Sequence, residues 1–151
     1  MTDIDELARR AQETGTVIAV AESLTSGNLA ATIGAAEGAG DWFAGGVVAY
    51  RLETKHRVLD LAPGIDPCSP ECAEQLARAV RDLTGADLAV SATGVGGPEP
   101  HDGHDPGTVY LGWSDGDGTG HLLLELDGDP EQVIDDSVDA ALGLLLDRLR
   151  S

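Results

Sequence analysis

The chain has 151 residues and a mass of 15.5 kDa, enough for one compact domain with its own core and too little for two of ordinary size. Hydrophobic residues make up 42% of it, but no apolar run approaches the ~18 residues that a membrane helix needs. We therefore expect a single domain over residues 1–151 that does not enter a membrane. The start shows no secretory signal, and the two cysteines, spaced C-x3-C, match neither a redox nor a zinc motif, so we expect a cytoplasmic protein.

The charge is strongly negative, with 27 acidic and nine basic residues and a formal net charge of −18. A phosphate backbone or an anionic membrane needs clustered basic side chains, so nucleic-acid and membrane partners are disfavoured. Lys55 is the only lysine, and the other basic residues are arginines. An acidic, lysine-poor surface is typical of proteins that work in concentrated salt, because carboxylates stay hydrated where charge is screened. A salt-loving origin is our hypothesis, and simple solubility is the alternative.

Helical and strand patterns alternate through the first part of the chain. Asp3 and Glu6 offer a capping pair for a first helix, and Gly15 is placed to end it. The expected elements are a helix over 3–14, a buried strand over 16–21, a helix that follows the turn 22–27 and ends near Gly34, a strand over 46–50, and a short helix to about Leu61.

The second part begins with a strong helix start, in which Ser69 is the cap and Pro70 the first helical residue. Cys72 falls on the apolar stripe of this helix, which Gly85 closes, so it is expected to be a small core residue. A strand over 87–92, a hairpin of 108–113 and 121–126 with a loop at 114–120, and a helix from 129–130 to Leu149 complete the pattern. The order indicates an α/β fold: one layered domain with a mixed sheet of about five strands flanked by helices.

Ser23 is the first candidate for chemistry, because a buried strand ends there and turns at once into a helix. The amides of Thr25, Ser26 and Gly27 at the helix start are expected to be free to hold an anion. A hydroxyl nucleophile beside such donors suits acyl transfer, whose tetrahedral intermediate carries negative charge on oxygen. The alternative is that these hydroxyls only cap the helix.

Tyr50 and Lys55 form the second candidate, at the end of a glycine-led strand and one turn into the next helix. A serine nucleophile needs a base, and a desolvated lysine can be neutral near pH 7. Every other Lys or Arg position is an arginine, which cannot release a proton, so the presence of the single lysine here favours a role as a base. The alternative is a surface cation paired with Glu53.

Two further segments carry chemistry-bearing residues. Thr93, Gly94, Gly96 and Gly97 follow a strand, and their backbone could approach a ligand closely, although a tight turn is the alternative. The run 101–105 holds four potential metal ligands, two His and two Asp, but no supporting pair is evident elsewhere. We therefore expect no metal and no cofactor, and the alternative is a metal hydrolase that uses His101 and His104.

In their combination and order, these segments resemble the CinA C-terminal domain family, the nicotinamide-nucleotide amidohydrolases. The resemblance covers nearly the whole chain. It is carried by Ala21-Glu22-Ser23 with Thr25 and Gly27, the strand Gly45 to Tyr50 with Lys55, Ala86 to Val90, Thr93-Gly94 with Gly97-Pro98, and Gly107 to Tyr110.

This resemblance implies a mechanism and partners. Ser23 would be the nucleophile, Lys55 the general base and Tyr50 a residue that relays or positions the proton. The substrate would be a small molecule, the pyridine nucleotide nicotinamide mononucleotide, deamidated without a metal by a homo-oligomer.

The sequence departs from the family pattern at Leu24, Ser26 and Leu52, but the most telling departures concern the nucleotide phosphate. Pro130 and Ile134 stand near positions where the resemblance implies basic residues, in the most acidic part of the chain. The alternative function is therefore a non-catalytic relative that acts as a nucleotide-binding or interaction module.

Overall fold

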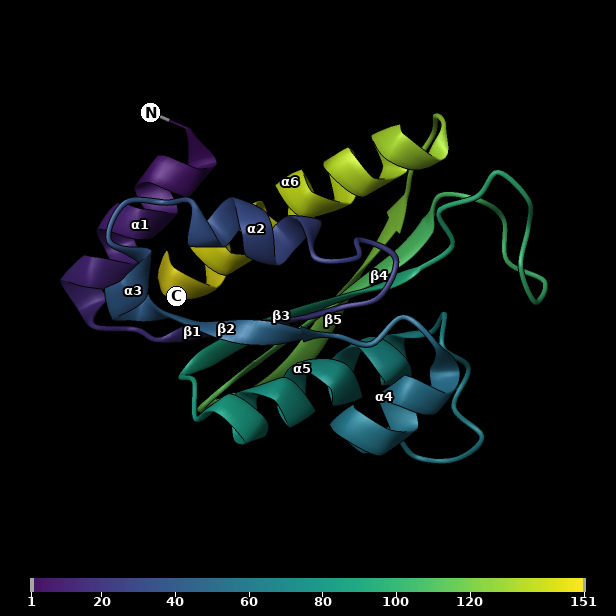
Figure 1. Ribbon diagram of the computed structural model, residues 1–151, viewed down its shortest axis with the longest axis horizontal. Helices are drawn as coiled ribbons and strands as arrows, with labels where there is room; N and C mark the ends of the chain where they lie inside the picture. The colour runs from purple at the N-terminus through teal and green to yellow at the C-terminus, as the bar shows by residue number, and fades with distance from the viewer. Residues whose placement is uncertain (1, 151) are drawn as a thin grey trace.

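The computed structural model describes residues 2–150, and a five-stranded mixed sheet runs through its middle (Figure 1). The strands are β1 (Ile18–Glu22), β2 (Phe43–Val48), β3 (Leu88–Gly94), β4 (Thr108–Asp115) and β5 (Gly118–Glu125). Their order is β2-β1-β3-β4-β5, with β1 parallel to both β2 and β3 and the β3, β4 and β5 pairs antiparallel. The expected α/β fold with a mixed sheet of five strands is confirmed.

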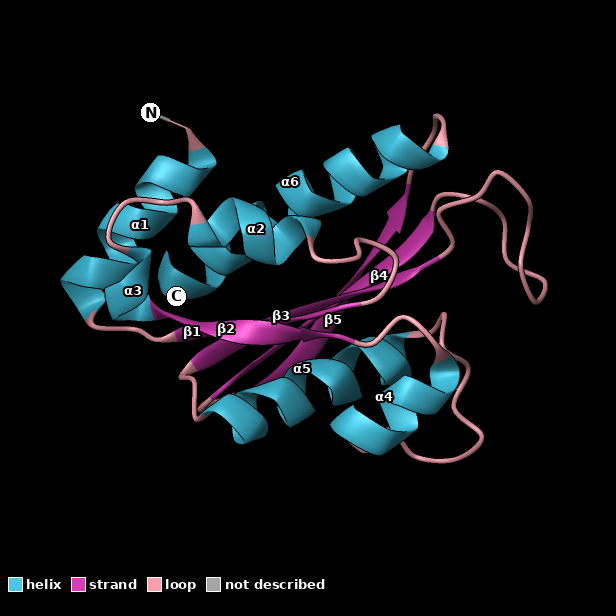
Figure 2. Ribbon diagram, viewed as in Figure 1, coloured by secondary structure: helices cyan, strands magenta, loops and turns pink. Residues whose placement is uncertain are grey.

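Helices cover both faces of the sheet (Figure 2). One face carries α1 (Asp3–Thr14), α2 (Asn28–Gly34), α3 (Ala39–Trp42) and α6 (Pro130–Arg150), and the other carries α4 (Leu52–Leu59) and α5 (Pro70–Thr84). None of the helices in the described part of the chain is long and apolar enough to cross a membrane.

The α1/α2/α6 face holds the larger core. Its fully buried side chains include Leu7, Val20, Leu29, Trp42 and Leu145, which come from four helices and the interior strand β1. The helical spacing of leucine, valine and alanine in α6 supplies much of this surface. Large aliphatic side chains therefore compensate for the scarcity of aromatic residues.

The α4/α5 face is built from smaller side chains. Ala19, Ala21 and Ala89 line the sheet there, and α5 approaches so closely that a Cβ at Gly112 would collide with the Ala73 carbonyl oxygen. Small residues thus bring α5 against the sheet, and polar groups at the sheet's edge are buried beneath the two helices.

Several element ends differ from the sequence expectations. The cap of α1 is Thr2, which forms a capping box with Asp5, so the expected pair of Asp3 and Glu6 was wrong by one residue. The short helix α3 was not expected. The strand expected over 16–21 is β1 at 18–22, and the strand expected over 46–50 is β2 at 43–48, because pairing with neighbours decides strand ends.

The hairpin turn is shorter than the expected loop over 114–120. Asp115 ends β4, and its carboxylate accepts hydrogen bonds from the amides of Asp117 and Gly118. This side chain closes a tight turn, so β5 starts at Gly118. Helix α5 has the expected cap Ser69 and ends at Gly85.

Candidate active site

Ser23 directly follows β1 and extends its ladder, because its amide donates to the Ala92 carbonyl at 2.9 Å. Side chains alternate along a strand, which assigns Ser23 to the same sheet face as Ala19 and Ala21, the α4/α5 face. Ser23 is 7% exposed, and its hydroxyl has no hydrogen-bond partner within residues 2–150. Ser23 is therefore buried, while its hydroxyl makes no hydrogen bond within the described residues.

Lys55 is buried in α4 with 2% of its surface exposed. Its Nζ donates to the Tyr50 carbonyl at 2.8 Å. Burial lowers the pKa of Lys55 below its ordinary value of 10.5, and the nearby Cys72 opposes this shift. Glu53 pairs instead with Arg51 and Arg57. The alternative of a surface ion pair between Lys55 and Glu53 was therefore wrong.

The fold brings these two residues to one edge and one face of the sheet. β1 and β2 are parallel, so Ser23 and the chain leading into α4 leave the sheet at the same end. Leu59 of α4 packs in the same hydrophobic cluster as Ala21. The recorded hydrogen bond of Lys55 goes to Tyr50 rather than to Ser23, and catalytic hydrogen bonds commonly tighten only when substrate is bound.

Tyr50 lies beside Lys55 but contributes a different group from the one expected. The residue is 64% exposed, and its hydroxyl has no hydrogen-bond partner in the described chain. Its backbone carbonyl holds the Lys55 amine. That Tyr50 relays or positions the proton stays a prediction, and the contact with Lys55 in this structure is made by its main chain rather than by its phenol.

Cys72 is buried near the Lys55 amine, and the Thr93 side chain is buried beside Cys72. Burial raises the pKa of the Cys72 thiol to about 11, although Lys55 acts to lower it. A thiol with this pKa stays protonated at neutral pH, as expected for a core residue. Thr93 is 1% exposed, and its hydroxyl donates to the Pro67 carbonyl at 2.6 Å.

The β1–α2 turn differs from expectation because Glu22 fills the helix start. Its buried carboxylate accepts from the amides of Gly27, Leu29 and Ala30 at 3.2, 2.9 and 2.9 Å. Ser26 N donates to the Ser23 carbonyl. The expectation of free amides at Ser26 and Gly27 was wrong, since the protein uses both.

Of the three amides predicted to be free, that of Thr25 has no hydrogen-bond acceptor in the described chain. The neighbouring amide of Leu24 has none there either. Sequence reasoning did not assign Glu22 a role. A carboxylate at the end of a buried strand, separated from the following helix by a short turn, was the available signal.

The glycine-rich segment forms part of the connection to β4. Gly94 belongs to β3, and a Cβ there would collide with the Thr108 carbonyl oxygen, so this glycine permits close strand packing. Gly96 and Gly97 follow in the loop, where Gly97-Pro98 is a cis peptide. The long loop that this segment opens, residues 95–107, projects from the same end of the sheet as Ser23 (Figure 1).

The run 101–105 does not form a metal centre. The described residues include no group of three or more His, Cys, Asp or Glu side chains that could hold an ion. His104 instead contacts Asp66 at 2.8 Å, and His101 contacts Asp102 at 3.2 Å. The pairing with Asp66 joins the 95–107 loop to the segment that leads into α5.

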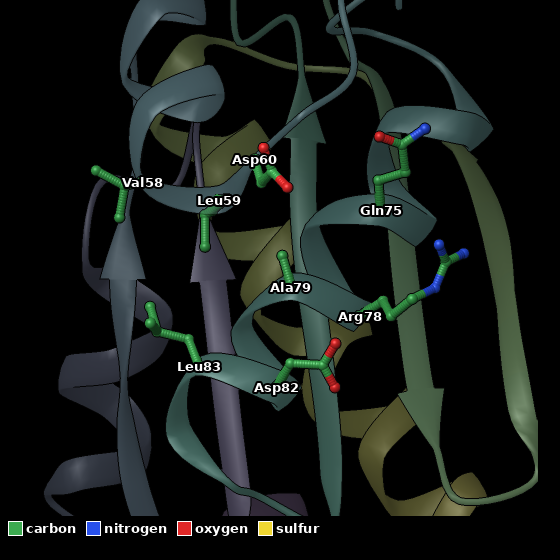
Figure 3. A pocket seen from close by; sticks show the side chains of 8 residues that line it. All are labelled: Val58, Leu59, Asp60, Gln75, Arg78, Ala79, Asp82 and Leu83. Atoms are coloured by element: carbon green, nitrogen blue, oxygen red, sulfur yellow. The ribbon is translucent and has the colours of Figure 1, made fainter.

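A surface groove of about 350 Å³ lies elsewhere, between α4 and α5 (Figure 3). It is lined by Val58, Leu59, Asp60, Gln75, Arg78, Ala79, Asp82 and Leu83. The lining does not include Ser23, Tyr50, Lys55 or any other predicted site residue, so this groove is distinct from the Ser23 site.

Comparison with known proteins agrees with this fold. A sequence model of the CinA C-terminal domain matches residues 2–149. The chain belongs to the CinA C-terminal domain family. It is 41% identical over 115 residues to a competence-damage inducible protein of Bacillus velezensis, which covers 74% of this chain and 28% of that protein.

Another competence-damage inducible protein, from Halalkalibacterium halodurans, is 34% identical over 152 residues, covering 97% of this chain and 36% of the relative. The chain thus spans about a third of the length of the curated relatives it matches.

Solved structures of the CinA superfamily extend the likeness to three dimensions. A Klebsiella pneumoniae protein superposes with a TM-score of 0.94 at 29% identity, covering 98% of this chain and 96% of that one. An Agrobacterium tumefaciens competence/damage inducible protein gives a TM-score of 0.90 at 26% identity, covering 100% and 98%. These matches cover nearly the full length of both chains, so the fold of this CinA family member is that of known relatives.

Proposed function

We propose that the chain is an amidohydrolase that deamidates nicotinamide mononucleotide, or a related small carboxamide, to the acid and ammonia. The observation that carries this proposal is the burial of the only lysine at the edge and face of the sheet where Ser23 ends β1. Burial lowers the pKa of this amine, which favours its neutral form, and a neutral amine is a base that can accept a proton from a serine hydroxyl.

In the proposed reaction, Ser23 Oγ attacks the carboxamide carbon while its proton passes to neutral Lys55 Nζ. The carbonyl electron pair moves to oxygen and gives a tetrahedral oxyanion. Collapse of this intermediate breaks the C–N bond, and the Lys55 ammonium returns the proton to the departing ammonia. Water then hydrolyses the ester with Lys55 again as base, which releases the acid and restores Ser23.

The Tyr50 carbonyl supports this role of Lys55 because it can accept from an amine in either protonation state and fix the direction of Nζ. The Thr93 hydroxyl donates to the Pro67 carbonyl, so we assign Thr93 to the lining of the site rather than to proton transfer.

The acidic start of α6 bears on the choice of substrate. β5 runs in the same direction as β1, so the turn from β5 into α6 lies at the Ser23 edge of the sheet. Asp129 caps α6 by accepting from Gln132 N at 2.8 Å, and Glu131 follows it. Because these charges disfavour a phosphate, the dephosphorylated nucleoside belongs in the assay beside the nucleotide.

The test is ammonia release from both compounds in molar KCl, where the proposed salt adaptation of this acidic chain would favour the folded state. Ser23→Ala should lower the rate by about 10⁴-fold or more. Lys55→Arg should abolish turnover because arginine does not release a proton. Turnover that survives both substitutions would exclude this mechanism. Ligand-induced thermal stabilisation without turnover would favour the alternative, a nucleotide-binding module.

A further inference from the structure

The β1–α2 turn separates two adjacent side chains onto opposite faces of the sheet. Alternation assigns Ser23 to the α4/α5 face, whereas Glu22 is on the other face and accepts from three amides at the start of α2. Glu22 is 1% exposed, so its carboxylate is stabilised by these amides rather than by water.

The conformation of this turn is demanding. Ser26 has φ of +51° and Gly27 has φ of +97°, both in the left-handed region. A non-glycine residue adopts that region only at a cost, which the surrounding contacts must offset. The Ser26 N bond to the Ser23 carbonyl and the Gly27 N bond to Glu22 are the contacts that hold it.

The backbone amides of this turn that donate to no protein group are the ones available for chemistry. Gly27, Leu29 and Ala30 donate to Glu22, and Ser26 donates to Ser23, but Leu24 N and Thr25 N have no acceptor within residues 2–150. These are the first two amides after the nucleophile. A backbone N–H directly after an attacking residue is well placed to receive the oxygen of a tetrahedral intermediate.

We propose that Glu22 is a positioning residue for amide cleavage: by holding the start of α2 it fixes the turn so that the Leu24 and Thr25 amides donate to the oxyanion formed on Ser23. This inference rests on the proposed function. It also excludes the start of α2 as the oxyanion site, because the protein's own carboxylate already fills it.

The first experiment compares Glu22→Gln with Asp87→Asn. Both changes replace a carboxylate that accepts a backbone amide, but Asp87 binds Val17 N at the opposite end of the sheet. We expect Glu22→Gln to lower kcat by about 10²-fold, the loss typical of one oxyanion donor, with KM changed less than about threefold. The acid limb of the pH–kcat profile should stay in place, since Glu22 lies on the face opposite Lys55. Asp87→Asn should retain kcat.

Equal losses of kcat in both variants, or a shifted acid limb in Glu22→Gln, would overturn the positioning role. A second variant covers the case in which Glu22→Gln does not fold. Replacing the Leu24–Thr25 peptide by an ester removes Thr25 N–H and leaves Glu22 in place. A kcat lower by about 10²-fold supports the assignment, and an unchanged kcat contradicts it.

Reaction of Ser23 with a fluorophosphonate separates this inference from the proposed function. The reagent's phosphorus is attacked by Ser23 Oγ with loss of fluoride, and it needs the nucleophile and its oxyanion donors but no pyridine substrate. If the chain is labelled but releases no ammonia, the proposed substrate is wrong, and slower labelling of Glu22→Gln would still support positioning. Labelling at equal rates would overturn positioning alone, and an unreactive Ser23 would overturn both.

Discussion

The two faces of the sheet bury different kinds of side chain. The α1/α2/α6 face is filled by large aliphatic residues and Trp42, and it also buries the Glu22 carboxyl group, which accepts from three amides. The α4/α5 face has alanines against the sheet and buries Lys55, Ser91 and Thr93. The first face is organised for stability. The second has less apolar volume, packs its helices more closely and buries polar groups.

The difference between the two faces can be expressed as the free-energy cost of burying a polar group. Burying a lysine amine costs desolvation free energy, whereas burying a leucine at the same place would be favourable. A protein keeps such an amine where the lost stability is outweighed by what the amine does. The comparison therefore predicts opposite outcomes for substitutions on the two faces.

The largest effect should come from Lys55→Met, which replaces the buried amine by an apolar chain of similar length. We expect ammonia release to fall by about 10³-fold or more, while stability near neutral pH is retained or increased, because the buried amine loses hydration in the folded state. Urea unfolding beside the activity assay would check both. A large loss of stability would show that Lys55 serves the fold instead.

The pH dependence of stability sharpens this prediction. The folded-state pKa of Lys55 lies below 10.5, so the unfolded chain binds more protons between the two values, and this group adds stability as pH rises through that window. In Lys55→Met this rise should be absent. For the same reason, activity should rise with pH through the lowered pKa as the amine becomes neutral.

Leu145→Ala tests the apolar face. Leu145 is fully buried in α6, so its truncation should cost about 2–5 kcal/mol of unfolding free energy and leave kcat unchanged at temperatures where the variant is folded. Denaturation in urea gives the first quantity and ammonia release the second. A fall in kcat for the fully folded variant would contradict the separation of the two faces.

Ala21→Val and Ala141→Val form a matched pair of overpacking changes. Both alanines are fully buried, Ala21 under α5 and Ala141 in α6. Each valine should cost about 1–3 kcal/mol. Only Ala21→Val should also lower kcat, because Ala21 lies two residues before Ser23 on the same face. Equal kcat values for the two variants would show that the site tolerates movement of β1.

The smallest effect should come from the exposed pair between His104 and Asp66. Burial raises the pKa of Asp66, but hydrogen bonds from His104 and from Cys68 N outweigh it and hold the pKa below 3.8. Asp66→Asn should therefore cost less than about 1 kcal/mol near pH 7. That difference should vanish as pH falls through the lowered pKa. A larger cost would indicate that the 95–107 loop supports the site.

Much of this protein follows from local sequence signals. Ser69-Pro70 and Gly85 delimit α5 because caps and left-handed ends depend on a few neighbouring residues. The spacing of Leu142, Leu145 and their neighbours predicts the face of α6 that packs against the core. The position of Ser23 at a strand-to-helix turn could also be predicted from its neighbours in the sequence.

Tertiary structure alone decided the rest. Whether Lys55 is a surface cation or a buried amine depends on α5 packing over α4, which no spacing near Lys55 encodes. Whether the amides of Ser26 and Gly27 are free depends on the conformation of the turn and on where the Glu22 side chain lies. Glu22 and Ser23 lie on opposite faces of the sheet because side chains alternate along β1, and the end of β1 is fixed by its pairing with β2 and β3. The sequence by itself determined which groups are present and the order of the elements. Burial and hydrogen-bond partners, which set pKa and reactivity, arise only when distant segments meet.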